Sequence, residues 1–198
     1  MNSHFLNRTR ELNFLLNKFH STKPELLIFR GRRRVGKTFL LKEFANRVNG
    51  LYLMGTISSR TEQLTRFSQA LADFFHDPLL TVRSLGSWDE FFLYLNQKIT
   101  TRTAVIIDEY LYLTESSPGL SSILQKYWDK YFKDNPNLFL VLNGSALSMM
   151  ERETLNGQSP LYGRRTGQWF VEPFNVIENH AFFRGNALVE AIEWYAIS

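Results

Sequence analysis

Hydrophobic positions along the chain follow two alternating patterns, short apolar runs of strand length and longer stretches with helical spacing. The apolar runs predict strands over residues 25–29, 51–54, 105–107, 138–142 and 168–171. Apolar residues that recur at every third or fourth position predict helices over residues 7–19, 37–48, 61–75 and 120–132. Because parallel strands need helical crossovers, this alternation predicts an α/β fold, with a mostly parallel sheet covered by helices on both faces.

One more helix is predicted from its start signal. Ser87 is followed three residues later by Glu90, the spacing of a capping box, in which each side chain satisfies a free backbone amide at a helix start. The helix that follows should run to about Ile99.

Residues 1–173 form the predicted core domain, and residues 174–198 are expected to begin a second, helical region. Within that region, residues 176–183 and 187–197 predict helices. The second helix keeps an apolar face up to the end of the sequence and has no glycine, asparagine or basic residue to cap it. We therefore expect a C-terminal helical region shortened by truncation or in nature.

Composition indicates an ordinary folded protein. Of the 198 residues, 44% are hydrophobic and 21% charged, and the longest apolar runs are far shorter than the ~20 residues that cross a bilayer. The N-terminus has no apolar signal region, so we expect a cytoplasmic protein that does not enter a membrane. The sequence has no cysteine, which excludes disulfides and thiolate metal sites, and its four histidines lack metal-ligand spacing.

The charge balance is mildly basic. The net charge is +4 and the pI is about 9.4, with part of the excess in Arg30 and residues 32–34. This composition permits contact with nucleic acid, but the excess is small. DNA therefore stays a weakly supported alternative partner.

Residues 31–38 carry the most specific chemical signal in the sequence. They read G-R-R-R-V-G-K-T, which satisfies the pattern G-x-x-x-x-G-K-[ST] between a predicted strand and a predicted helix. The glycines let the backbone wrap an anion, and the helix N-terminus adds its positive end. We expect Lys37 to contact the β- and γ-phosphates of a nucleotide and the Thr38 hydroxyl to hold magnesium.

A second signal lies at the end of the predicted strand at 105–107. Apolar residues 104–107 deliver two acids, Asp108 and Glu109, to the carboxyl edge of the sheet, where ligands bind in open α/β folds. We expect Asp108 to hold the magnesium through its waters and Glu109 to orient or deprotonate an attacking water.

Two further segments supply candidate polar groups. The strand at 138–142 runs into Asn143, Gly144 and Ser145, so Asn143 or Ser145 could sense the γ-phosphate, or could only form a turn and a helix cap. The loop at 160–166 contains Arg164 and Arg165, either of which could stabilise transferred charge in its own molecule or in a neighbour.

Taken together, these motifs resemble those of the archaeal-type ATPases, in the STAND division of P-loop proteins related to AAA+. Residues 5–12, F-L-N-R-T-R-E-L, are similar to the family's F-x-N-R-x-x-E-L signature, which is associated with nucleotide binding. The motifs at 31–38, 106–110, 143–145 and 160–164 fall in the family's order. The resemblance implies ATP as the nucleotide, a five-stranded sheet of order 5-1-4-3-2, Arg164 as the arginine that matters, and a helical lid region beginning after residue 173.

The resulting expectation is a magnesium-dependent ATPase that acts as a conformational or signalling switch. A protein partner or a homo-oligomer is compatible with it. The alternatives are a nucleotide-dependent DNA-associated protein and an ATP-binding fragment that does not hydrolyse. The expected catalytic residues are Lys37, Glu109 and Arg164, and the expected magnesium ligands are Thr38 and Asp108. The expected nucleotide-binding residues are Gly31, Arg32, Arg33, Arg34, Val35, Gly36, Lys37, Thr38, Phe39, Arg8, Asn143 and Ser145.

Overall fold

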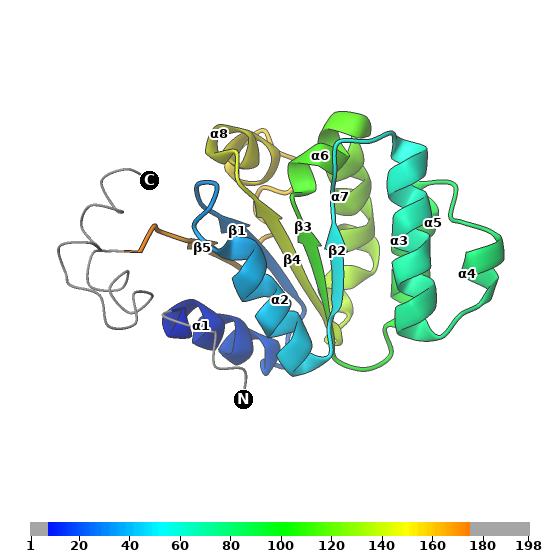
Figure 1. Cartoon of the computed structure of the whole chain (residues 1–198), viewed down its shortest axis with the longest axis horizontal. Coiled ribbons are helices and arrows are strands. Elements are labelled where there is room, and N and C mark those ends of the chain that lie inside the picture. The colour runs from blue at the N-terminus through cyan, green and yellow to red at the C-terminus, as the bar shows by residue number, and fades with distance from the viewer. Residues whose placement is uncertain (1–7, 175–198) are drawn as a thin grey trace, which may run out of the picture.

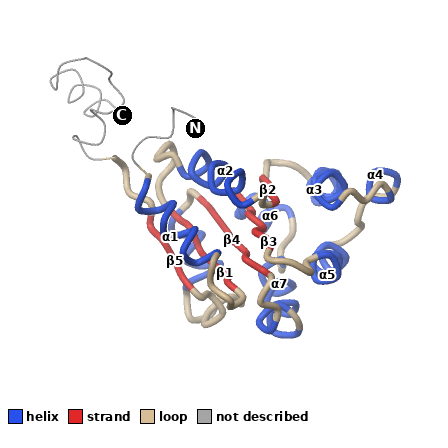
Figure 2. The backbone as a smooth tube through the Cα atoms, turned by 90° about the horizontal axis from the view of Figure 1, so that it is seen from below, coloured by secondary structure: helices blue, strands red, loops and turns tan. Residues whose placement is uncertain are grey.

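The computed structural model describes residues 8–174 of the chain. In this part a central sheet lies between two layers of helices (Figures 1 and 2). The helices predicted at 176–183 and 187–197, the expected lid region, and the first three residues of the segment 5–12 lie outside the described residues.

The sheet contains five strands in the order β2-β3-β4-β1-β5, and every neighbouring pair is parallel. This order is the expected 5-1-4-3-2 read from the other edge, and it confirms the predicted fold class. The strands are β1 (Glu25–Arg30), β2 (Leu51–Met54), β3 (Thr103–Asp108), β4 (Leu138–Gly144) and β5 (Gly167–Phe170).

Helices cover both faces of the sheet, because each crossover between parallel strands returns over one face or the other. On one face lie α1 (Thr9–Phe19) and α2 (Lys37–Val48). The other face is covered by α3 (Arg60–Phe75), α5 (Trp88–Lys98), α6 (Tyr110–Ser116) and α7 (Leu120–Lys130). The remaining helical segments are α4 (Leu79–Val82), α8 (Leu147–Met150), a π-helical turn (Glu151–Leu155) and a 3-10 turn (Phe132–Asp134).

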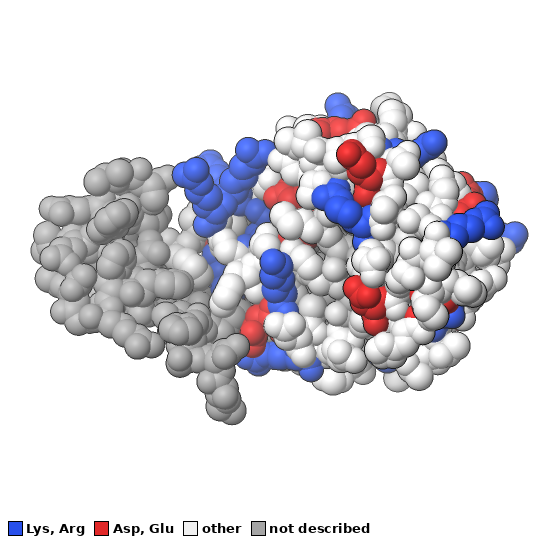
Figure 3. Space-filling view, turned by 45° about the vertical axis from the view of Figure 1, so that its right-hand side comes forward, with Lys and Arg blue, Asp and Glu red and all other residues white. Residues whose placement is uncertain are grey.

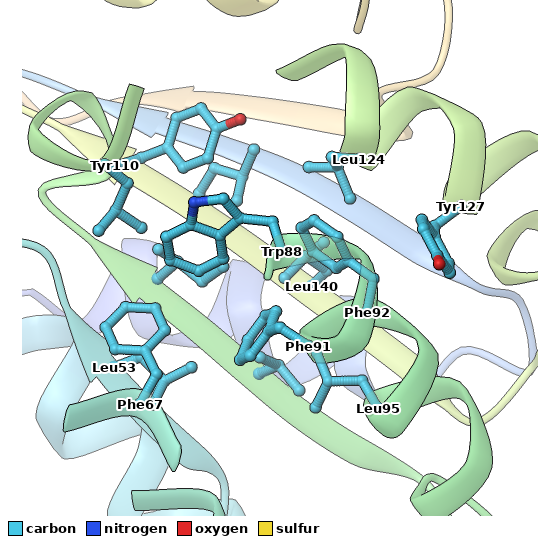
Figure 4. Close-up of a cluster of buried hydrophobic side chains, with 14 of the residues drawn as sticks. Leu53, Phe67, Trp88, Phe91, Phe92, Leu95, Tyr110, Leu124, Tyr127 and Leu140 are labelled. Atoms are coloured by element: carbon cyan, nitrogen blue, oxygen red, sulfur yellow. The ribbon is translucent and has the colours of Figure 1, made fainter. Parts of the chain in front are cut away.

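The central strands are apolar on both sides because both sides are buried. In β1, Leu27 and Phe29 pack under α1 and α2, whereas Leu26 and Ile28 pack on the opposite face. That opposite face holds the larger core, in which aromatic rings of α3 and α5 pack against one another in edge and tilted contacts (Figure 4). Full burial of one such ring contributes about 1.5–3 kcal/mol.

The capping box lies at a different helix from the predicted one. At Ser87 the side chain accepts from the Glu90 amide, but the Glu90 carboxylate accepts from Gly86 N–H and not from Ser87. The complete reciprocal pair caps α3, where Ser59 accepts from the Glu62 amide and Glu62 accepts from Ser59 N–H at 2.9 Å. The start of α5 therefore has only half of the predicted box.

The topology gathers the chemical motifs at one edge of the sheet. Strands β3, β4 and β1 are adjacent and parallel, so the segments that follow their carboxyl ends lie together. These segments are the loop at 31–36, the pair Asp108 and Glu109, and residues 143–145.

Among the described residues, no helix is long and apolar enough to span a membrane.

Candidate functional site

The loop at 31–36 wraps closely between β1 and α2, and its glycines are needed for that path. A Cβ on Gly31 would lie 2.4 Å from the carbonyl oxygen of Val171, so the chain after β5 approaches too closely for any side chain there. Gly36 has a φ of 83°, in the left-handed region that glycine adopts without strain. Val35 is buried beneath the loop, while Arg32, Arg33 and Arg34 are exposed.

Lys37 closes the loop from inside. Its ammonium donates to the carbonyl oxygens of Gly31 at 2.7 Å and Arg32 at 2.6 Å, and the residue is 5% exposed. Burial lowers the pKa of Lys37, while the Glu109 and Asp108 carboxylates oppose that shift. The loop therefore holds a desolvated cation at its centre, bonded to carbonyls that an anionic ligand could replace.

Asp108 is fully buried and accepts hydrogen bonds at both carboxylate oxygens. Oδ2 accepts from the Thr38 hydroxyl at 2.8 Å and from the Tyr52 hydroxyl at 2.6 Å. Oδ1 accepts from the backbone N–H of Glu109 at 2.8 Å and from the side-chain amide of Asn143. The two expected magnesium ligands are thus in direct contact at the start of α2.

Glu109 is turned toward β4 by an unusual backbone conformation. Its φ of 50° is left-handed, which is uncommon for a residue with a side chain, and it marks the point where β3 turns into α6. In this conformation its carboxylate accepts from the Ser145 hydroxyl at 3.1 Å. The structure therefore brings the predicted water-activating acid and one of the two candidate sensors together.

Asn143 lies beside this pair and is also fully buried. Its Nδ2 group donates to Asp108, but among the described residues its Oδ1 atom has no hydrogen-bond partner. A buried acceptor without a donor is costly, by about 1–3 kcal/mol. The oxygen is suited to accept from a bound water or ligand.

A pocket of about 460 Å³ opens over these groups. Its lining includes Lys37, Thr38 and Glu109 from the site, together with Arg33, Arg34, Phe39 and Lys42, and Phe39 is 53% exposed. Arg33 is oriented by a 3.1 Å hydrogen bond to the Tyr112 hydroxyl. On the face shown in Figure 3, acidic side chains lie among the basic ones, so the basic side chains form no single continuous surface.

Arg8 lies behind the loop. The guanidinium is 5% exposed and donates to the carbonyl oxygens of Val35 at 2.7 Å and Glu172 at 2.8 Å, pairs with Glu11, and covers the Phe174 ring at 3.8 Å. It therefore connects the loop to the segment after β5. A role in nucleotide binding stays a prediction, and the contact through Val35 makes that role indirect.

Arg164 is not brought to this site. It forms a two-point ion pair with Asp129 in the last turn of α7, at 2.8 and 2.6 Å. Two residues later the N–H of Thr166 donates to the carbonyl of Leu26, near the start of β1 and away from the loop at 31–36. These contacts give the expected catalytic role of Arg164 no support within its own molecule, and a contact with a neighbouring molecule stays a prediction.

Tyr52 is a site residue that sequence reasoning missed. It lies in β2, at the edge of the sheet, and its contact with Asp108 depends on the register that pairs Met54 with Asp108. Burial and the nearby carboxylate raise the pKa of Tyr52, so its hydroxyl stays protonated and able to donate. In the sequence, the one feature that could have indicated its role is the presence of a tyrosine within the apolar strand predicted at 51–54.

Comparison with known proteins assigns the chain to a family. The family model described as an ATPase domain predominantly from Archaea matches residues 5–190. An uncharacterized protein of Methanocaldococcus jannaschii is 30% identical over 195 residues, which is 98% of this chain and 42% of that protein. An uncharacterized ATP-binding protein of the same organism is 55% identical over 40 residues, 20% of this chain and 68% of its own length.

Solved structures agree with the fold. The Walker-type ATPase of Pyrococcus abyssi superimposes with a TM-score of 0.69 at 25% identity, covering 96% of this chain and 62% of that one. The ORC2 protein of Aeropyrum pernix has a TM-score of 0.58 at 17% identity, over 92% of this chain and 53% of its own, and supports the fold alone. The chain thus spans less than two thirds of the first relative and of both structures.

The buried lysine, the Thr38–Asp108 contact and the parallel sheet are what an ATP-binding domain of this kind requires. With the family model matching residues 5–190, the chain belongs to the family of ATPase domains found predominantly in Archaea.

Proposed function

We propose that the site binds ATP with magnesium, hydrolyses it, and uses the change in bound nucleotide as a conformational switch. The observation that carries the proposal is the direct contact between Thr38, in the first turn of α2, and the buried carboxylate of Asp108. In P-loop proteins these two groups come from the two motifs that share one magnesium ion.

The residues fit the nucleotide on chemical grounds. The Lys37 ammonium donates to the Gly31 and Arg32 carbonyls, and β- and γ-phosphate oxygens would replace those acceptors. The loop amides and the N-terminus of α2 add partial positive charge where the phosphates would lie. Arg33 and Arg34 line the pocket and would face the nucleotide or the solvent.

The magnesium ion would be held by the Thr38 hydroxyl and, through water, by Asp108, whose carboxylate lies within hydrogen-bond distance of that hydroxyl. When bound, the ion would neutralise charge that develops on the β- and γ-phosphates. No cluster of three or more acidic or histidine ligands is present in residues 8–174, and a site completed by phosphates does not need one.

Glu109 is the proposed base. Its carboxylate would take a proton from a water molecule as the water oxygen attacks the γ-phosphorus, and the bond to the β–γ bridging oxygen would break to release ADP. Ser145 would hold the carboxylate in place, and the free Oδ1 atom of Asn143 would accept from the same water.

Arg8 supports the switch part of the proposal. It binds the carbonyl of Val35 in the loop and that of Glu172 after β5, so a change in loop geometry on phosphate release would alter the position of the following segment. In nucleotide switches, loops that the γ-phosphate holds are released when it is hydrolysed.

Calorimetric titration with ATP and magnesium tests the binding step. We expect Lys37→Ala to abolish binding, and Lys126→Ala, which removes an exposed lysine from α7, to bind like wild type. Equal binding by wild type and Lys37→Ala would contradict the proposed site. Binding by wild type without phosphate release would instead support an ATP-binding protein that does not hydrolyse.

A further inference from the structure

Tyr52 contacts the centre of the site from a strand that carries none of the recognised motifs. Its hydroxyl donates to Asp108 Oδ2 at 2.6 Å, across the junction between β2 and β3. The ammonium of Lys42, on α2, lies 5.3 Å from the centre of the tyrosine ring, on which it forms a cation–π contact. Tyr52 is thus held between α2 and β3 with its hydroxyl directed at the carboxylate.

This contact completes the set of donors around a buried charge. Asp108 is 0% exposed, so hydrogen bonds from the protein replace the water that would otherwise solvate its carboxylate. Oδ1 is held by Asn143 and by the Glu109 amide, whereas Oδ2 is held by two hydroxyls, those of Thr38 and Tyr52. Of these two hydroxyls, only Thr38's is expected to bind a metal ion.

We propose that Tyr52 is a positioning residue of the magnesium site, whose hydroxyl fixes the orientation in which Asp108 meets the hydrated ion. The inference rests on the proposed function, because it assigns Asp108 to the ion. It adds β2 to the elements that build the site.

The physical reason is the mobility that the carboxylate would gain without this donor. Asp108 and Lys37 attract each other electrostatically, so the ammonium is an alternative partner for the carboxylate. Without the Tyr52 hydroxyl, Oδ2 would rely on Thr38 alone and could turn toward Lys37. Binding of the ion would then have to reverse that rotation, whereas binding of the nucleotide without magnesium would not.

The test compares ATP affinity with excess magnesium and with EDTA, by calorimetry, for wild type and Tyr52→Phe. We expect Tyr52→Phe to lose about tenfold in affinity with magnesium, the weight of one hydrogen bond to a charged group, and less than about twofold in EDTA. Tyr94→Phe is the matched control, since it removes a similar tyrosine–aspartate hydrogen bond, to Asp77 at 3.0 Å, in a different part of the fold. That control should bind like wild type under both conditions.

Equal losses with and without magnesium, or no loss with magnesium, would overturn the inference. A second measurement avoids dependence on the variant's folding: 3-fluorotyrosine placed at position 52 or 94 keeps the hydroxyl and reports by fluorine NMR. With ADP bound, magnesium should shift the resonance at 52 and leave that at 94 unchanged, and an unresponsive resonance at 52 would also overturn the inference. If wild type itself failed to bind ATP with magnesium, the proposed function would fail instead.

Discussion

Replacing Arg164 with alanine should destabilise the fold and leave ATP turnover within a single molecule unchanged. The guanidinium donates twice to Asp129 and also to the carbonyl oxygens of Pro160 at 3.0 Å and Tyr162 at 3.1 Å. The ion-pair partners are 25% and 46% exposed, so solvent screens much of their attraction and the pair contributes about 0.2–1 kcal/mol. With the two carbonyl contacts, we expect a total loss of about 1–2 kcal/mol in the free energy of unfolding.

The assay is thermal unfolding together with phosphate release. A loss of this size corresponds to a fall of about 3–6 °C in the unfolding midpoint for a chain of this length. A double-mutant cycle with Asp129→Ala should give a coupling energy of about 0.5–1 kcal/mol, which assigns part of the loss to the pair. Arg165→Ala is the matched control for loss of an arginine from the same loop.

The pH dependence gives an independent check. Hydrogen bonding from Arg164 lowers the pKa of Asp129 below its ordinary 3.8 in the folded state. As pH falls, Asp129 therefore binds a proton in the unfolded chain before it does so in the folded one. The stabilisation that the Arg164–Asp129 pair gives the fold is complete well above pH 3.8 and is lost as pH drops through the folded pKa of Asp129. The difference between wild type and Arg164→Ala should shrink accordingly in acid. A variant of normal stability that cannot hydrolyse ATP would refute this reasoning.

Three other substitutions test single features of the structure. Gly31→Ala would place a Cβ 2.4 Å from the Val171 carbonyl oxygen. The resulting backbone shift should cost about 1–3 kcal/mol in the free energy of unfolding and weaken ATP binding in calorimetry. Wild-type affinity in this variant would contradict the path of the loop. Ser59→Ala removes the complete capping box of α3, so denaturant unfolding should show a loss of about 1 kcal/mol with unchanged ATP affinity, and no loss would contradict the cap. Arg8→Lys keeps the charge but cannot span the carbonyls of Val35 and Glu172. The free energy of unfolding should fall by on the order of 1–2 kcal/mol, which lowers the unfolding midpoint by several degrees. An unchanged midpoint would show that neither contact matters.

The alternating elements of the core were predictable because burial imposes them. Both faces of the sheet are covered, so the strands are continuous apolar runs, and α2 follows a loop whose glycines are required by the close approach of Val171 and by the backbone at Gly36. The short helices α4, α6 and α8 were missed, since four to seven residues are too few for a helical period to appear. The order of the strands came from the family resemblance and not from periodicity.

The site was predictable only as far as its residues follow strand ends. Lys37, Thr38, Asp108 and Glu109 meet because parallel strands deliver them to one edge of the sheet. Tyr52 joins them through the lateral register between β2 and β3, which no local pattern specifies. Arg164 is separated from them because β5 pairs in parallel with β1. The loop before β5 therefore ends near the start of β1, at the opposite end of the strands from the site.

Phosphate release under single-turnover conditions tests the central claim most directly. Wild type with ATP and magnesium should release phosphate, and EDTA should stop the release. Glu109→Gln, which keeps the shape of the side chain and a hydrogen bond to Ser145, should bind ATP with unchanged affinity and release phosphate at least about 100-fold more slowly. Equal rates for wild type and Glu109→Gln would contradict the assignment of Glu109 as the base in an ATP-hydrolysing site.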